Sequence, residues 1–490
     1  MARSQWSFKT AVELSAALAA KKVSAVELAE DAIGRIERHD RKINAICVRD
    51  FERALAAART ADAELARGAN RPLLGIPLTV KESYNVAGLP TTWGIPAHKD
   101  FRPAEDALSI SRVKDAGGVI LGKTNVPLGL GDWQSYNDIY GTTSNPFDLG
   151  RTPGGSSGGS SAALAAGYGP LSLGSDIGGS LRVPAFHCGV YAHKPTYGLV
   201  PPRGHVPPPF QPLPIDRDLA VIGPMARSAA DLALLLDVIA GPDPLDAGNA
   251  YRLDLPPPRH DALKGFRVLV IDTDPVMPTD EVVRGTIHKL AAGLEKAGVR
   301  VDRNSALLPN FAETSRLYMR MLMSFLAASF PPDVYEGAQA AAAALPASET
   351  NLSAERLRGI SLSHRAWLMD DVARAHLRAK WRELFRSYDA VICPIMPTPA
   401  YPHDHSDEQE KRRIRIDGKD HVYPDQLAWP GIATLPGLPS TALPTGFSPE
   451  GLPVGVQIVG PWLEDRTPLR LAELIERELG GFKPPPMFDD

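Results

Sequence analysis

Two serines framed by glycines, together with one lysine, are the residues of this chain best suited to chemistry. Ser156 lies in Gly-Gly-Ser-Ser-Gly-Gly-Ser-Ser at 154–161, and Ser180 follows in Gly-Ser-Asp-Ile-Gly-Gly-Ser-Leu-Arg at 174–182. Lys81 stands 75 positions before Ser156, at the end of an apolar run. A serine hydroxyl is a poor nucleophile at neutral pH and requires an adjacent base. The combination indicates nucleophilic catalysis without a histidine.

Lysine serves as that base only when it is neutral. Its pKa of about 10.4 must therefore fall through desolvation or a nearby positive charge. The preceding residues Leu78-Thr79-Val80 read as a buried strand, which would bury the amine as well. The alternative is that Lys81 begins a surface turn at Glu82-Ser83 and stays charged. The local sequence leaves both interpretations open.

The octet at 154–161 has three other interpretations. A flexible linker is flanked by polar or low-complexity sequence, whereas this octet leads directly into the apolar run at 162–166. A phosphate-binding loop is disfavoured because the Gly-Lys-Ser/Thr ending of a Walker loop is absent. A nucleophile elbow centred on Ser157 needs a buried strand just before it, and the residues at 148–153 do not read as one.

A set of short segments occurs in the order of one known family and extends the pattern beyond the two serines. The segments lie at 75–81, 122–125, 145–146, 154–160, 174–185, 194–198 and 451–457. With them the chain resembles the amidase signature hydrolases from about residue 8 to about residue 475. The resemblance implies an amidase signature fold and a Ser-cisSer-Lys triad, carried over to Ser180, Ser156 and Lys81.

The mechanism implied by the resemblance is a proton relay. Lys81 takes a proton from Ser156, Ser156 takes one from Ser180, and Ser180 attacks the carbonyl carbon. Ser156 then returns its proton to the leaving nitrogen, which an amide requires because an amide anion is a very poor leaving group. In the family the peptide bond at the middle serine is cis, and the glycines beside Ser156 would give the backbone room for it.

Other site residues follow from the same resemblance. Backbone N–H groups of the loop before the nucleophile would form an oxyanion hole, since glycine lets the main chain approach the substrate closely. The residues of this oxyanion loop are Ile177, Gly178, Gly179 and Ser180. The expected supporting residues are Asp176 and Arg182 as the scaffold of this loop, with Ser157 and Thr79 as further partners.

The substrate pocket is predicted from segments where the family varies most. These are a proline-rich loop at 200–214 and a helix-like, methionine-rich stretch at 311–330, although methionines at helical spacing are more often core than pocket. The segment after Lys-Thr-Asn also differs from relatives, which often have Glu-Phe there. The predicted pocket residues are Asp132, Trp133, Gln134, Tyr318 and Met321. They form no basic cluster, so we expect an apolar or aromatic amide.

Composition excludes several classes of protein. The chain has 490 residues, 44% of them hydrophobic and 22% charged, as in an ordinary globular protein. Its net charge of −4 does not indicate the positively charged surface that nucleic-acid binding needs. No apolar run suits a membrane span or signal peptide. The cysteines Cys47, Cys188 and Cys393 are scattered, which favours reduced thiols in a cytoplasmic protein. We expect no cofactor, and a homodimer stays open.

A metal site is not expected either. The cluster His403-Asp404-His405 is the strongest candidate in the sequence, but it lies in a proline-rich turn with no third ligand at a characteristic spacing. The chemistry is therefore assigned to side chains and backbone alone.

Alternating patterns predict an α/β fold. Helical periodicity occurs at 11–20, 26–38 and 52–67, and later amphipathic stretches at 108–116 and 282–297 alternate with strand-like runs at 119–121 and 268–271. This alternation favours a mixed, largely parallel sheet covered by helices. Because motifs for one site span so much of the chain, we expect a single large domain over 1–490. It would contain an N-terminal helical segment at about 8–68 and a variable substrate-pocket region at about 200–430.

The predicted function is hydrolysis of a linear carboxylic amide, through an acyl-enzyme on Ser180, to a carboxylate and ammonia or an amine. One alternative is the amidase-like subunit of a glutamine-dependent tRNA amidotransferase, although the segment at 423–429 looks unlike that subunit. Esters or carbamates could be cleaved instead, because the acyl-enzyme route is shared. A non-catalytic scaffold conflicts with the intact Lys81, Ser156 and Ser180.

Overall fold

The computed structural model describes residues 4–488, and within them one mixed sheet of eleven strands runs through the molecule. From one edge to the other its strands are β1 (Ile46–Arg49), β3 (Val119–Thr124), β2 (Pro77–Lys81), β6 (Leu171–Asp176), β8 (Val221–Ala226), β7 (Tyr191–Lys194), β14 (Ser440–Phe447), β15 (Pro453–Val459), β11 (Ala390–Cys393), β9 (Arg267–Val270) and β10 (Arg300–Asp302).

Pairing in this sheet is parallel toward its ends and antiparallel in its middle. β2 pairs in parallel with β3 and β6, and β9 pairs in parallel with β11 and β10. The pairs from β6 through β8, β7, β14 and β15 to β11 are antiparallel, as is β1 with β3. The predicted α/β fold with a mixed sheet is confirmed, but the sheet is less parallel than predicted, because the pairs of its middle strands are antiparallel. Two small hairpins lie apart from it: β4 (Tyr136–Asn137) with β5 (Gly141–Thr142), and β12 (Arg413–Ile416) with β13 (Lys419–Val422).

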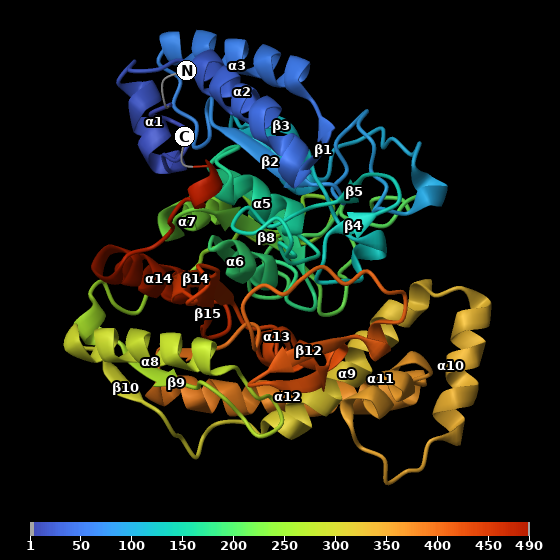
Figure 1. The fold of residues 1–490 in the computed structure, drawn as a ribbon. Helices are drawn as coiled ribbons and strands as arrows, with labels where there is room; N and C mark the ends of the chain where they lie inside the picture. The colour runs from blue at the N-terminus through green and yellow to red at the C-terminus, as the bar shows by residue number, and fades with distance from the viewer. Residues whose placement is uncertain (1–3, 489–490) are drawn as a thin grey trace.

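Helices cover the sheet along its length (Figure 1). The blue helices at the N-terminus lie over β1 to β3, and the yellow and orange helices gather at the opposite end of the molecule. The α-helices are α1 (Ala11–Ala19), α2 (Ala25–Ile43), α3 (Phe51–Ala66), α4 (Leu108–Asp115), α5 (Gly158–Ala165), α6 (Arg182–Cys188), α7 (Ala229–Ile239), α8 (Glu281–Lys296), α9 (Phe311–Leu326), α10 (Pro332–Ala344), α11 (Leu352–Ile360), α12 (His364–Ser387), α13 (Ala428–Thr434) and α14 (Arg466–Leu479).

The N-terminal helices form where their periodicity predicts them. α1 and α2 each begin with a capping box, Thr10 with Glu13 and Ser24 with Glu27, which satisfies N–H groups that the first turn leaves free. α2 runs five residues past the predicted end, and it stops where Asn44 adopts a left-handed conformation with φ 57°. The predicted strands and amphipathic helices further along the chain are confirmed as β3, β9, α4 and α8.

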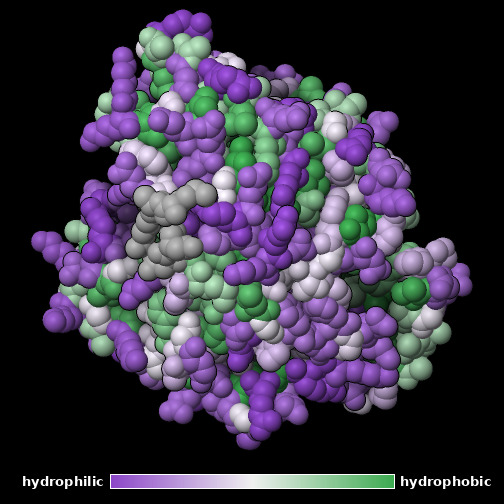
Figure 2. Space-filling model, turned by 45° about the horizontal axis from the view of Figure 1, so that its top comes forward, coloured by the Kyte–Doolittle hydropathy of each residue, from purple (hydrophilic) through white to green (hydrophobic). Residues whose placement is uncertain are grey.

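Two apolar clusters make up the core. The larger one lies along the sheet and its flanking helices, and the second packs α9, α12 and α13 around Trp381 and Trp429. On the face in Figure 2, hydrophilic residues predominate and apolar residues are scattered in small groups. In the described residues, none of the helices has the length and apolar character needed to cross a membrane.

Candidate active site

Lys81 and Ser175 meet at the carboxyl ends of two neighbouring parallel strands. β2 ends at Lys81, and its partner β6 carries Ser175 one position before its own end. The Lys81 Nζ lies 2.6 Å from the Ser156 Oγ and 2.9 Å from the Ser175 Oγ, and the side chain is fully buried. The predicted burial of Lys81 is confirmed. Ser175 was not among the predicted site residues, although it stands inside the segment at 174–182.

Burial sets the protonation of Lys81. Desolvation lowers the pKa of this amine to about 7, and the charge of Asp176 opposes that shift. Near neutral pH a large share of Lys81 is therefore unprotonated. A neutral amine has one lone pair and two N–H donors, so it accepts the Ser156 hydroxyl proton while donating to Ser175.

Ser156 follows a cis peptide bond with Gly155, as the resemblance predicts. A Cβ on Gly155 would lie 2.4 Å from the carbonyl oxygen of Asp132 and 2.8 Å from the backbone nitrogen of Gln134. These are backbone atoms that cannot move aside cheaply. Only glycine fits here, because the chain of 132–134 packs directly against the turn that carries Ser156.

Ser180 closes the oxyanion loop, and its backbone contacts the segment that carries Ser156. The Ser157 N–H donates to the Ser180 carbonyl at 3.2 Å, which ties the two serine segments together. Within residues 4–488, the N–H groups of Gly178 and Ser180 have no acceptor, whereas the Gly179 N–H donates to the Asp176 carboxylate at 2.9 Å. The Ile177 N–H likewise has no acceptor in residues 4–488, so three of the four predicted donors are free for an oxyanion. Gly179 has φ 93°, which favours glycine.

A buried ion pair between Asp176 and Arg182 supports the oxyanion loop. Arg182 binds both carboxylate oxygens of Asp176, at 2.9 and 3.0 Å, and both side chains are fully buried. Burial pushes the pKa of Asp176 upward, but the Arg182 charge outweighs it and leaves this pKa below its ordinary value. Arg182 also donates to the Pro430 carbonyl and to Thr434 on α13. This geometry suits the scaffold that the sequence predicts.

The two other predicted supporting residues differ in their contacts. The Ser157 hydroxyl lies 3.4 Å from both the backbone nitrogen and the carbonyl oxygen of Ser175, beside the lysine. Thr79 instead donates to Ser172 at 2.9 Å, further down β2 and β6. The structure therefore brings Ser157 to the site, whereas Thr79 lies two residues before Lys81 on β2 and contacts Ser172 instead.

The side chains of Asp132 and Gln134 bind a segment that lies far away in sequence. Asp132 forms an ion pair with Arg412 and accepts a hydrogen bond from Tyr423 at 2.7 Å. Gln134 binds the backbone of Asp404 through both ends of its amide, at 2.6 and 2.9 Å. These side chains join 132–134 to 404–423, while Trp133 between them points to the oxyanion loop.

Trp133 and Tyr318 both contact that loop. The Trp133 indole N–H donates to the Gly178 carbonyl at 2.8 Å, and the Tyr318 hydroxyl donates to the Ile177 carbonyl at 2.6 Å. Met321, one turn further along α9, is fully buried in the second core cluster. Of the five predicted pocket residues, Trp133 and Tyr318 thus lie at the predicted catalytic loop.

Arg217 is a charged residue near the site that sequence analysis missed. Its guanidinium lies over the rings of Trp93 and Phe325, with no ion pair or side-chain hydrogen bond in residues 4–488. Phe325 follows Tyr318 by two turns of α9 and so shares its face, about 10 Å along the helix. Arg217 lies just after the proline-rich loop at 200–214, and no pattern in the sequence around it indicates this position.

Neither nearby histidine is placed to act as the base. His187 is fully buried, and burial lowers its pKa to about 3. His193 contacts Thr441 and Asp465, and burial lowers its pKa as well. Both rings are therefore neutral near pH 7, and His193 is held by partners outside the site.

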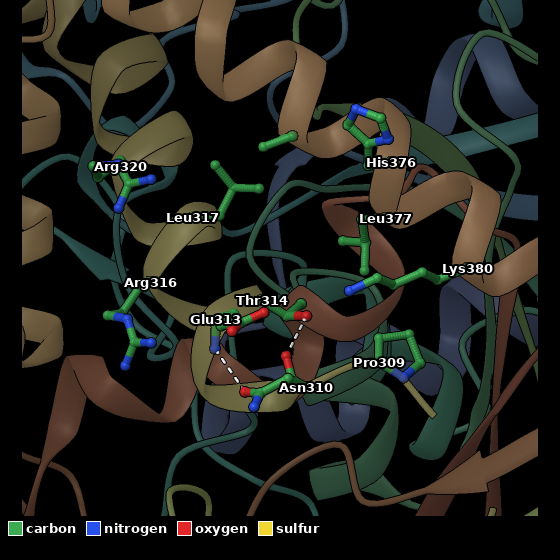
Figure 3. A pocket seen from close by; sticks show the side chains of 11 residues that line it. Pro309, Asn310, Glu313, Thr314, Arg316, Leu317, Arg320, His376, Leu377 and Lys380 are labelled. Carbon is green, nitrogen blue, oxygen red and sulfur yellow. Dashed lines mark hydrogen bonds between the residues drawn. The ribbon is translucent and has the colours of Figure 1, made fainter. Parts of the chain in front are cut away.

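A cavity of about 390 Å³ lies between α9 and α12, away from these residues (Figure 3). Leu317 and Leu377 point into it, with Arg316, His376 and Lys380 among its other lining residues. It holds no serine and no buried base, so it is not the candidate active site. Among residues 4–488 there is also no cluster of three or more side chains suited to a metal ion.

An α/β sheet that joins a buried lysine, a serine after a cis bond and a glycine-framed serine is the arrangement expected of amidase signature hydrolases. The family model described as Amidase matches residues 27–469, and the chain belongs to this family. A glutamyl-tRNA(Gln) amidotransferase subunit of Anaeromyxobacter sp. (strain K) is 35% identical over 504 residues, covering 97% of each chain.

Solved structures agree with this assignment. A protein from a vestigial complex that bears on the evolutionary origins of an s-triazine catabolic enzyme has a TM-score of 0.80 and 31% identity. The match covers 96% of this chain and 98% of that one. A 6-aminohexanoate cyclic dimer hydrolase has a TM-score of 0.77 and 26% identity, covering 98% and 99%.

Proposed function

We propose that this protein hydrolyses a carboxylic amide to a carboxylate and ammonia or an amine, through an acyl-enzyme on Ser180. The observation that carries the proposal is the 2.6 Å contact between the buried Lys81 amine and the Ser156 hydroxyl. Neutral Lys81 takes the Ser156 proton, Ser156 takes the Ser180 proton, and the Ser180 oxygen bonds to the carbonyl carbon. The free N–H groups of Gly178 and Ser180 receive the negative charge that develops on the carbonyl oxygen.

Collapse of the tetrahedral intermediate breaks the C–N bond. Ser156 passes its proton to the leaving nitrogen and regains one from Lys81, so that a neutral amine departs, the acyl group stays on Ser180 and Lys81 is neutral again. Water then attacks the ester by the same relay and releases the carboxylate. Apart from the substrate and this water, each step uses side chains and backbone groups of this chain.

The substrate that we propose is a primary or secondary amide with an apolar or aromatic group. Its pocket is assigned to the variable region at about 200–430, and the positions of Tyr318 and Phe325 on one face of α9 support this. The guanidinium of Arg217, which has no ion pair in residues 4–488, favours a second candidate, an amide that carries a carboxylate at its end near Phe325.

Other functions that use the same acyl-enzyme chemistry are alternatives. The relatives named as subunits of glutamyl-tRNA(Gln) amidotransferase support a role within such an enzyme, with glutamine as the amide. Esters or carbamates would use the same acyl-enzyme. We also propose a cytoplasmic location, which the three free cysteines support.

An activity screen of the purified chain tests the proposal. Aliphatic amides, aryl anilides, anilides with a distal carboxylate, carbamates, esters and glutamine are compared by release of amine or alcohol. Turnover of neutral anilides supports the first substrate class, and a preference for the carboxylated anilides, lost in Arg217→Gln, supports the second. Glutamine hydrolysis that appears only with partner subunits would assign the amidotransferase role.

A further inference from the structure

The N–H donors of an oxyanion hole belong to peptide units, and the contact made by the carbonyl of a unit sets the direction of its N–H. A peptide unit is planar and trans, so its C=O and N–H point in opposite directions. The loop at 177–180 contains three such units, and fixing the carbonyl of each one fixes the following N–H. The contacts of these carbonyls therefore decide whether the loop presents its N–H groups to a substrate.

All three carbonyls are held, by three different elements. Tyr318 donates to the Ile177 carbonyl at 2.6 Å, Trp133 to the Gly178 carbonyl at 2.8 Å, and the Val183 N–H to the Gly179 carbonyl at 2.7 Å. Val183 belongs to the helix that continues from the loop. Tyr318 and Trp133, in contrast, come from α9 and from the segment ahead of β4, far from the loop in sequence.

The bond from Tyr318 orients a free donor, as the bond from Val183 does for the Ser180 N–H. It holds the unit whose N–H belongs to Gly178, and this N–H has no acceptor in residues 4–488. Trp133 holds the next unit, whose N–H belongs to Gly179 and is anchored by Asp176. The two aromatic donors and the carboxylate thus immobilise the loop on both sides.

Both aromatic side chains are themselves fixed. Tyr318 is fully buried and Trp133 is 6% exposed. A Cβ on Gly431 of α13 would lie 2.5 Å from the Tyr318 Cδ1, so the ring fills the space that this glycine leaves. Burial raises the pKa of Tyr318, which keeps the hydroxyl protonated as a donor. The Trp133 ring packs edge-on against Tyr423.

We infer that Tyr318 and Trp133 are positioning residues for the oxyanion hole: they hold the Ile177 and Gly178 carbonyls so that the loop presents its N–H groups to the reacting carbonyl oxygen. The inference rests on the proposed function, since it assigns this loop to a tetrahedral intermediate. It also gives both residues a role in the chemical step, instead of the substrate contact that the sequence predicts.

Tyr318→Phe and Trp133→Phe remove one donor each and keep an aromatic ring. The probes are a fluorophosphonate, whose phosphoryl oxygen occupies the oxyanion position as the serine is labelled, and the best anilide from the activity screen. Each variant is expected to label and turn over about tenfold more slowly, as loss of one hydrogen bond suggests, with KM unchanged. The pH at which the rate reaches half its maximum should not move.

Gly431→Ala gives an independent test, because it displaces the Tyr318 ring and leaves the hydroxyl in place. It should slow labelling as Tyr318→Phe does. Tyr191→Phe and Trp381→Phe are matched controls, since both residues are fully buried and neither polar atom has a hydrogen bond in residues 4–488. They should label at the wild-type rate.

Two results would overturn the inference. One is wild-type labelling and kcat in both Tyr318→Phe and Trp133→Phe. The other is a raised KM with unchanged kcat, which would make these residues substrate contacts. Failure of the wild-type protein to label at all would instead refute the proposed function itself.

Discussion

The Lys81 amine and the Ser156 hydroxyl lie 2.6 Å apart, and both side chains are buried. Because burial lowers the pKa of the lysine to about 7, this contact joins a base that is substantially neutral at physiological pH to a hydroxyl that can pass the proton on. The remaining features of the site serve this pair: one strand end supplies Lys81, and a glycine turn supplies Ser156.

Replacing a member of the relay should remove turnover without unfolding the protein. Ser180→Ala is expected to abolish activity, and Lys81→Met and Ser156→Ala should each lower kcat by several orders of magnitude. Because the three groups act as one unit, the double variant should lose little more than either single one. Measured kcat and thermal unfolding check this. Ser161→Ala, which removes a buried hydroxyl with no hydrogen bond in residues 4–488, is the control.

Covalent labelling should identify the nucleophile directly. A fluorophosphonate is expected to modify Ser180, as mapped by mass spectrometry of peptides, and chelators should leave activity intact because no step uses a metal. An adduct on Ser157 would instead support the nucleophile-elbow interpretation of the octet.

The buried ion pair between Asp176 and Arg182 should contribute strongly to the free energy of unfolding. Arg182→Met leaves the Asp176 carboxylate buried without its partner, which is expected to cost about 3–5 kcal/mol in the free energy of unfolding. Denaturant unfolding measures this loss. Arg386→Met is the comparison, because its ion pair with Glu383 is largely exposed and its removal should have little effect. Equal losses in the two variants would contradict the assigned scaffold role.

Neither histidine near Ser180 should be needed for the pH dependence of kcat/KM. His187→Gln and His193→Gln are expected to keep the inflection of kcat/KM, because both rings are already neutral near pH 7. If either variant loses activity together with that inflection, the base is a histidine and the lysine relay is wrong.

Local patterns predicted the parts of the fold and site that depend on nearby residues. The apolar run before Lys81 left burial and a surface turn open, and the resemblance favoured burial, which is confirmed. Helical periodicity predicted the first three helices. The resemblance predicted the cis bond at Ser156. These features depend on chain segments that are contiguous in sequence or on a motif with a fixed conformation.

Contacts between distant segments could not be predicted in this way. Asp132 pairs with Arg412, 280 positions away, and Gln134 binds the backbone of Asp404, 270 positions away. No periodicity or spacing encodes such partners, so side chains predicted to face a substrate instead join two loops. Ser175 was missed for a related reason, because only the pairing of β6 with β2 brings it to Lys81.

The pH dependence of fluorophosphonate labelling at Ser180 tests the central claim most directly, since it requires no knowledge of the substrate. Protonated Lys81 cannot accept a proton, so the second-order rate constant should rise with pH from about 6 and level off on the alkaline side, with its inflection near the lysine pKa of about 7. Lys194 is also buried with a pKa of about 7. The variant Lys81→Met therefore shows which of the two lysines causes the inflection. We predict that Lys81→Met labels slowly and without that inflection; a Lys81→Met protein that keeps the wild-type rate and inflection would contradict the account.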